Sequence, residues 1–100
     1  MFEQFKNLNK AFENKTRLGI MSIMMMEDQV NFNSLKDALK LTDGNLASHL
    51  KALEKLGYIS VIKSFIGRKP NTSYSATKLG MNAFKKHIDA LESMLRDMNK

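Results

Sequence analysis

The 100-residue sequence contains no cysteine, so it cannot form a disulfide, bind a metal through thiolates or use a cysteine nucleophile. It has only one proline and an ordinary apolar content, which excludes wholesale disorder. No apolar run approaches the ~20 residues of a membrane-spanning helix. The amino-terminal stretch alternates charged and apolar residues too often for a signal peptide. We therefore expect a single cytoplasmic domain over residues 1–100, with no membrane partner.

Acidic residues are fewer than basic ones, and the formal net charge is +6. A positive charge favours a polyanionic partner, either nucleic acid or an anionic membrane surface. The last helical stretch mixes acids with bases and lacks tryptophan, which disfavours the membrane alternative. The two histidines are far apart, and neither a glycine-rich phosphate loop nor an acid pair with a nucleophile is present. The sequence therefore predicts neither an enzyme nor a cofactor.

The stretch from Leu41 to Gly57 predicts a helix, at about 43–56, whose two faces differ in chemistry. At ~100° per residue, its leucines form one apolar stripe. The opposite face is small near the start and basic toward the end: Gly44, Asn45, Ala47, Ser48, Lys51 and Lys55. Small residues allow close approach to DNA, asparagine and serine can hydrogen-bond base edges, and lysines suit phosphates. The alternative is an ordinary solvated face.

Three shorter segments precede this helix. Apolar spacing predicts a first helix over residues 3–14 and a central helix capped by Thr16. A short helix capped by Asn33 or Ser34 follows, and a turn with Thr42 or Asp43 as N-cap leads into the helix at 43–56. Two short helices joined by such a turn are typical of a helix-turn-helix, in which the second helix enters the major groove.

A β-hairpin over about 59–76 follows the glycine that ends this helix. The segment 58–65 is rich in β-branched and aromatic residues, residues 66–71 read as a loop containing Pro70, and residues 72–76 read as a returning strand. Its charged residues are all basic: Lys63, Arg68 and Lys69. We expect this basic wing to reach the DNA backbone or the minor groove.

The last segment, 77–99, predicts a long helix capped by Thr77. Its apolar residues from Met81 onward recur at alternating spacings of three and four, which is a heptad pattern. Because the domain before it is already complete, a spare apolar stripe indicates a second copy of the chain. The predicted dimer interface consists of Phe84, Ile88, Leu91, Leu95 and Met98.

Two other side chains have open interpretations. Arg17 suits a phosphate contact, but it can equally pair with Glu13 or another acid. His49 lies roughly 60° from the centre of the apolar stripe, which favours a residue hydrogen-bonded within the fold over a ligand.

Together these elements predict a mainly α (α+β) winged helix-turn-helix with a two-stranded wing and a long carboxyl-terminal dimerisation helix. The expected function is a dimeric, sequence-specific regulator that binds double-stranded DNA. The alternative is a winged-helix protein–protein interaction module that does not read DNA, because fold alone does not imply function.

The stretch from Phe32 to Gly80 also resembles the small winged-helix transcriptional regulators of the MarR/ArsR-like superfamily. The likeness rests on residues 46–50, on Gly57-Tyr58-Ile59 and on Thr77-Lys78-Leu79-Gly80, and it covers roughly residues 15–95. It implies a homodimer that reads a pseudo-palindromic site and dimerises through its terminal helices. Metal-sensing relatives use cysteine and histidine clusters that this sequence lacks, and no small-molecule effector is indicated.

Overall fold

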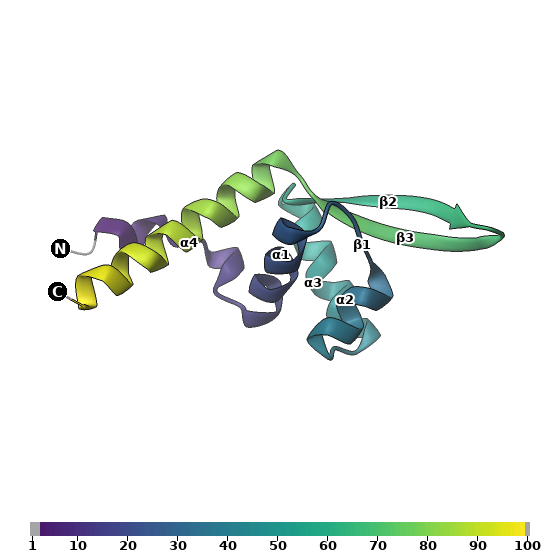
Figure 1. The fold of residues 1–100 in the computed structure, drawn as a ribbon, viewed down its shortest axis with the longest axis horizontal. Helices are drawn as coiled ribbons and strands as arrows, with labels where there is room; N and C mark the ends of the chain where they lie inside the picture. Colours follow the sequence, from purple (N-terminus) through teal and green to yellow (C-terminus); the bar gives the residue numbers. More distant parts are fainter. Residues whose placement is uncertain (1–2, 100) are drawn as a thin grey trace.

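The computed structural model describes residues 3–99, and its long axis measures 56 Å against 25 and 21 Å for the other two. Two arms leave a helical body in opposite directions, a hairpin at one end and the last helix at the other (Figure 1). The elements in chain order are η1 (Glu3–Asn7), η2 (Lys10–Phe12), α1 (Lys15–Met26), β1 (Val30–Asn31), α2 (Phe32–Leu39), α3 (Asp43–Lys55), β2 (Ile59–Ile66), β3 (Lys69–Ala76) and α4 (Lys78–Met98).

The amino-terminal segment is not the single amphipathic helix expected over 3–14. It forms the two 3₁₀ helices η1 and η2 instead, because Asn9 lies between them in an extended conformation. The Asn9 side chain caps η2 by accepting a hydrogen bond from the Ala11 amide, at 2.9 Å. Phe12 is buried, so the segment still contributes a side chain to the core.

Asparagines cap two helices for which the sequence favoured other residues. Asn14, rather than Thr16, caps α1 by accepting hydrogen bonds from the amides of residues 16 and 17. Asn31, rather than Asn33 or Ser34, caps α2. Asparagine is a stronger N-cap than threonine, which accounts for the difference at α1. The helix α2 begins at Phe32, earlier than expected, so the residue before it provides the cap. The caps at Thr42 and Thr77 are confirmed.

The sheet has the order β1-β3-β2, and both pairings are antiparallel. The hairpin is longer than expected, since Ile66 pairs with Lys69 and leaves only Gly67 and Arg68 in the turn. Gly67 has a φ of +66°, as a two-residue hairpin turn requires. Pro70 therefore lies in β3, opposite Phe65, and not in a loop. It is tolerated because β1 does not extend along this part of β3.

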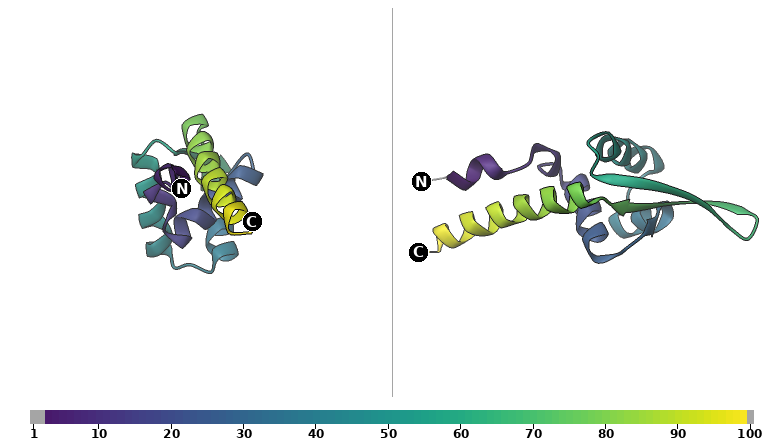
Figure 2. Two further views of the ribbon diagram at one scale, coloured as in Figure 1. Left: turned by 90° about the vertical axis from the view of Figure 1, so that its left-hand side faces the viewer. Right: turned by 90° about the horizontal axis from the view of Figure 1, so that it is seen from above.

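The core lies between the three helices of the body and the base of the sheet, and it consists of Phe12, Ile20, Met21, Met24, Val30, Leu35, Leu46, Leu50, Leu53, Ile59 and Phe84. Phe12 packs against three rings, those of Tyr58, Phe84 and His87. This aromatic cluster ties the amino-terminal segment, the start of β2 and the first half of α4 into one body. Beyond it, η1 and the rest of α4 run side by side away from the body (Figure 2).

Candidate nucleic-acid interface

The helix α3 separates its two faces as its sequence predicts. Leu46, Leu50 and Leu53 are buried in the core. The helix ends before Gly57, whose φ of +77° suits a glycine after a helix terminus. The six predicted contact residues of this helix are all exposed: Gly44, Asn45, Ala47, Ser48, Lys51 and Lys55. Their side of the helix is therefore free to meet a partner.

The first turn of α3 carries an acid, but a neighbouring cation balances it. Asp43 Oδ1 lies 3.0 Å from Lys36 Nζ of α2. This hydrogen bond and the charge of Asp43 raise the pKa of Lys36 above its ordinary value. The ion pair joins the two helices of the helix-turn-helix at the surface and offsets the negative charge beside the small residues of α3.

His49 and Arg17 face each other inside the fold. Arg17 Nε donates to the Ala11 carbonyl at 2.7 Å, and its Nη1 lies 3.1 Å from His49 Nδ1. Burial, followed by the charge of Arg17, lowers the pKa of His49 below its ordinary value, so the ring accepts this hydrogen bond in its neutral form. The guanidinium thus braces α3 against α1 and the amino-terminal segment, in place of an ion pair with Glu13.

The wing presents cations without acids. Lys63, Arg68 and Lys69 are all exposed. No aspartate or glutamate occurs in the sequence from Lys55 to Ile88, a range that includes the whole hairpin. A positive surface of this kind attracts polyanions and is strengthened by the absence of competing ion pairs.

A shallow depression joins α3 to the wing. Its lining from α3 includes Ala47, Lys51 and Glu54, and its lining from the hairpin includes Lys63 and Thr72. The structure therefore brings predicted contact residues from both elements onto one surface. Burial and the charge of Glu54 raise the pKa of Tyr74, which also lines this depression.

Sequence reasoning missed two residues of this surface. Thr72 lies directly across from Lys63 in the strand register, and Tyr74 lies across from Val61. Cross-strand partners share a face of the sheet. The alternation of residues along the hairpin therefore identifies Thr72 and Tyr74 once the strand register is known.

The predicted dimer residues on α4 divide into two groups. Phe84 is 5% exposed and belongs to the core of its own chain, so its assignment to a dimer interface is wrong. Leu91 is half-buried. Ile88, Leu95 and Met98 are 36%, 57% and 74% exposed, and Met81 is exposed as well. A heptad pattern alone does not distinguish the core of one chain from a contact between two chains.

Met81, Ile88 and Leu95 recur every seven residues and lie on one edge of α4. The neighbouring positions turn toward the body, where His87 is 3% exposed and accepts a hydrogen bond at Nδ1 from the Asn9 amide, at 2.9 Å. Burial lowers the pKa of His87, and the charge of Glu13 opposes part of that shift.

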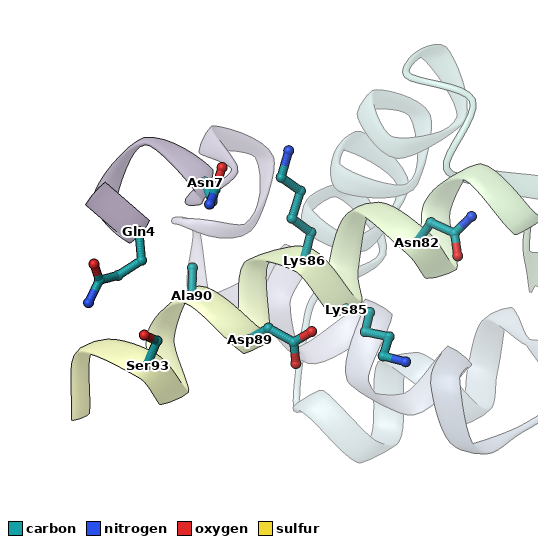
Figure 3. A pocket seen from close by; sticks show the side chains of 8 residues that line it. All are labelled: Gln4, Asn7, Asn82, Lys85, Lys86, Asp89, Ala90 and Ser93. Carbon is teal, nitrogen blue, oxygen red and sulfur yellow. The ribbon is translucent and has the colours of Figure 1, made fainter. Parts of the chain in front are cut away.

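A second depression lies between η1 and another side of α4. Figure 3 shows its lining, in which Lys85, Lys86 and Asp89 project from the helix in different directions, and the depression is open to solvent. Gln4 Nε2 donates to Asp97 Oδ2 across the two elements, at 2.7 Å. Small-molecule sites are mostly apolar and enclosed, so this depression does not resemble one.

Within residues 3–99, no group of three potential metal-ligating side chains comes together. None of the helices in that range has the length and apolarity needed to cross a membrane.

Comparison with known families decides the classification. Residues 16–95 match the family described as the winged helix DNA-binding domain. The chain belongs to this family. An uncharacterised protein of Methanocaldococcus jannaschii is 39% identical over 79 residues, which are 79% of this chain and 86% of that protein. The resemblance to winged-helix DNA-binding proteins is thereby confirmed.

Solved structures agree with the assignment. The transcriptional regulator homologue of Pyrococcus horikoshii superposes with a TM-score of 0.89 at 30% identity and covers 98% of this chain and 99% of its own. YusO of Bacillus subtilis has a TM-score of 0.81 at 11% identity, covering 96% of this chain and 67% of its own, and shows the shared fold alone. The family and the Pyrococcus horikoshii relative indicate a transcriptional regulator rather than an enzyme.

Proposed function

We propose that two copies of this protein bind one pseudo-palindromic site on double-stranded DNA in the cytoplasm and regulate transcription there. The observation that carries the proposal is the single exposed surface formed by α3 and the wing, on which Ala47, Lys51 and Lys63 meet. A recognition helix and an acid-free hairpin on one side of the body match the two features of a duplex, its grooves and its phosphates.

In this proposal α3 enters the major groove. Gly44 and Ala47 carry little side chain, which lets the helix backbone approach the bases. Asn45 and Ser48 donate and accept hydrogen bonds at base edges, and asparagine can pair with adenine through two of them. Lys51 and Lys55 lie one to three turns farther along and bind the flanking phosphates.

The wing contacts the DNA backbone beside the helix α3. Lys63 is nearest the depression that joins the two elements, and Arg68 and Lys69 lie at the tip. Cations spaced along a ribbon can bind successive phosphates or follow the minor groove, and each phosphate contact releases condensed counterions.

A second copy of the chain would cover α4. Ile88, Leu95 and Met98 are exposed along the helix, and Phe5 of η1 is exposed beside it. Monomeric proteins rarely leave a continuous apolar stripe in water, and a two-fold axis through such a stripe pairs it with itself. The half-buried Leu91 would contribute to both the body and this contact.

The double substitution of Arg68 and Lys69 by alanine tests the DNA proposal. We expect binding to every duplex to weaken, because these cations contact phosphates and not bases. Each lost phosphate contact should lower the slope of log affinity against log salt by about 0.9. Titrations of a labelled duplex at several salt concentrations measure both quantities.

Lys10 and Lys86 provide the matched control, since they are exposed together on a different part of the molecule. Their double alanine variant removes the same charge but should leave the salt slope unchanged. Equal slopes for wild type and the wing variant would contradict the wing assignment. If wild type shows no salt-dependent affinity for duplex DNA, a protein-interaction module is the better explanation.

A further inference from the structure

The tip of the wing exposes two large apolar side chains. Phe65 is 72% exposed and Ile66 is 67% exposed. They lie far from the core, since β1 pairs with β3 only at residues 73 and 74 and leaves the outer hairpin as an uncovered ribbon (Figure 1). Removing a phenyl ring from water is favourable, so contact of Phe65 with an apolar partner at this tip would be stabilising.

The strand register separates these two side chains. Phe65 lies across from Pro70. Lys63, two residues earlier in β2, and its cross-strand partner Thr72 share the same face of the ribbon as Phe65. Lys63 and Thr72 line the depression against α3, so this face continues the proposed DNA surface. Ile66 and its partner Lys69 lie on the opposite face, from which Lys69 can reach the far wall of a groove that the tip enters.

Charge decides what kind of partner fits this tip. Arg68 and Lys69 lie within four residues of Phe65, and no acid occurs anywhere in the hairpin. The partner must therefore be a polyanion that also offers an apolar slot. Duplex DNA has both, because phosphates line the minor groove and its floor consists of stacked bases.

We propose that Phe65, supported by Pro70, enters the minor groove beside each half-site and wedges against one base step. This inference rests on the proposed DNA binding. Apolar side chains inserted in this way partly unstack a step and bend the duplex away from the minor groove. Pyrimidine–purine steps deform most easily, so the wedge adds a preference for a TA or CA step outside the bases that α3 touches.

The experiment uses the full chain and duplexes that share one selected binding site but differ in the flanking step. Wild type should bind a flank with a TA step roughly tenfold more tightly than a stiff A-tract flank. Phe65→Ala should reduce this ratio to near one. Ile66→Ala is the matched control and should keep the ratio, since its side chain has similar exposure but points to the other face.

A 2-aminopurine base placed in the flank gives a direct readout, because its fluorescence rises when it is unstacked. Wild type and Ile66→Ala should raise the signal at one step, and Phe65→Ala should not. Phe65→Leu, which keeps an apolar but shorter side chain in the strand, should give an intermediate signal and excludes a merely disordered tip.

The outcomes separate the two proposals. If wild type binds DNA with a salt-dependent affinity but all variants show the same flank ratio and no unstacking, the wedge is wrong and the DNA-binding proposal stands. If Ile66→Ala loses the ratio and Phe65→Ala keeps it, the assignment of faces is wrong. If wild type does not bind duplex DNA, both proposals fall.

Discussion

The two arms of the molecule both expose apolar side chains, but their charges differ. The wing carries Phe65 and Ile66 among cations and contains no acid. The outer part of α4 carries Leu95 and Met98 among Asp89, Glu92, Arg96 and Asp97, and Glu92 and Arg96 form an ion pair at 2.6 Å.

This difference separates two kinds of partner. Exposed apolar groups in a uniformly positive setting suit a polyanion, whose charge is opposite everywhere along the contact. Exposed apolar groups among charges of both signs suit a protein surface, and a second copy offers the same mixture with each acid near a base. The exposure of apolar side chains alone does not distinguish the two arms, and only their charges indicate different partners.

The largest expected effect comes from the joint at which both arms leave the body. A Cβ on Gly80 would lie 2.0 Å from the Tyr58 carbonyl oxygen, which also accepts a hydrogen bond from the Thr77 amide. Gly80→Ala should therefore lower the free energy of unfolding by about 3 kcal/mol, because backbone must move. Urea unfolding followed by circular dichroism measures this.

Gly44→Ala is the control for that substitution, since a Cβ there would meet nothing within 4 Å. It should raise the stability by up to about 1 kcal/mol through helix propensity. If both variants unfolded at the same urea concentration, the two arms would not share a rigid joint.

The next prediction concerns the exposed apolar residues of α4. Ile88→Lys combined with Leu95→Lys should produce monomers, because two charges on each copy would be buried against apolar groups. We expect the dimer to weaken by at least about 2 kcal/mol, or roughly 30-fold, as measured by sedimentation equilibrium. Leu79→Lys adds a charge at another exposed apolar site of α4 and should leave the dimer intact. If the double variant remained dimeric, α4 would not form the dimer interface.

A smaller effect is expected for base recognition by the helix α3. Asn45→Ala and Ser48→Ala should each change which bases are preferred, at a cost of about 1 kcal/mol per half-site, and leave the salt slope unchanged. Selection of bound sequences from a random DNA pool reads out the preference. Lys51→Ala should weaken all sequences alike, and an unaltered preference in the asparagine and serine variants would count against base reading.

The smallest effect concerns pH. Burial holds the pKa of His87 below 6.5, so the unfolded chain binds the proton first as the solution is acidified. Stability should be constant above about pH 6.5 and fall below it, and the Asn9 amide should exchange faster because it loses its acceptor. His87→Gln should flatten this decline, as judged by chemical denaturation at each pH. Equal profiles for wild type and His87→Gln would refute a role for this ring.

Much of the fold followed from local patterns in the sequence. The apolar stripe of α3, the cap at Thr42 and the glycine after the helix fixed that element closely, because each acts within a few residues. The amino-terminal segment was misread, since the periodicity of Phe5, Leu8 and Phe12 does not reveal that the Asn9 side chain bonds its own backbone neighbour. Asn9 also bonds His87 and Tyr58, which are distant in sequence.

The sequence by itself determined the helix-turn-helix, the chemistry of its outer face and the lack of acids in the hairpin. These depend on periodicity and composition, which are properties of neighbouring residues. Only the tertiary structure decided that Phe84 belongs to the core and Ile88 and Leu95 do not, because burial depends on what packs against each side of α4. Strand register likewise turned Phe65 toward the α3 side and Ile66 away, since one residue of shift exchanges the faces of a strand.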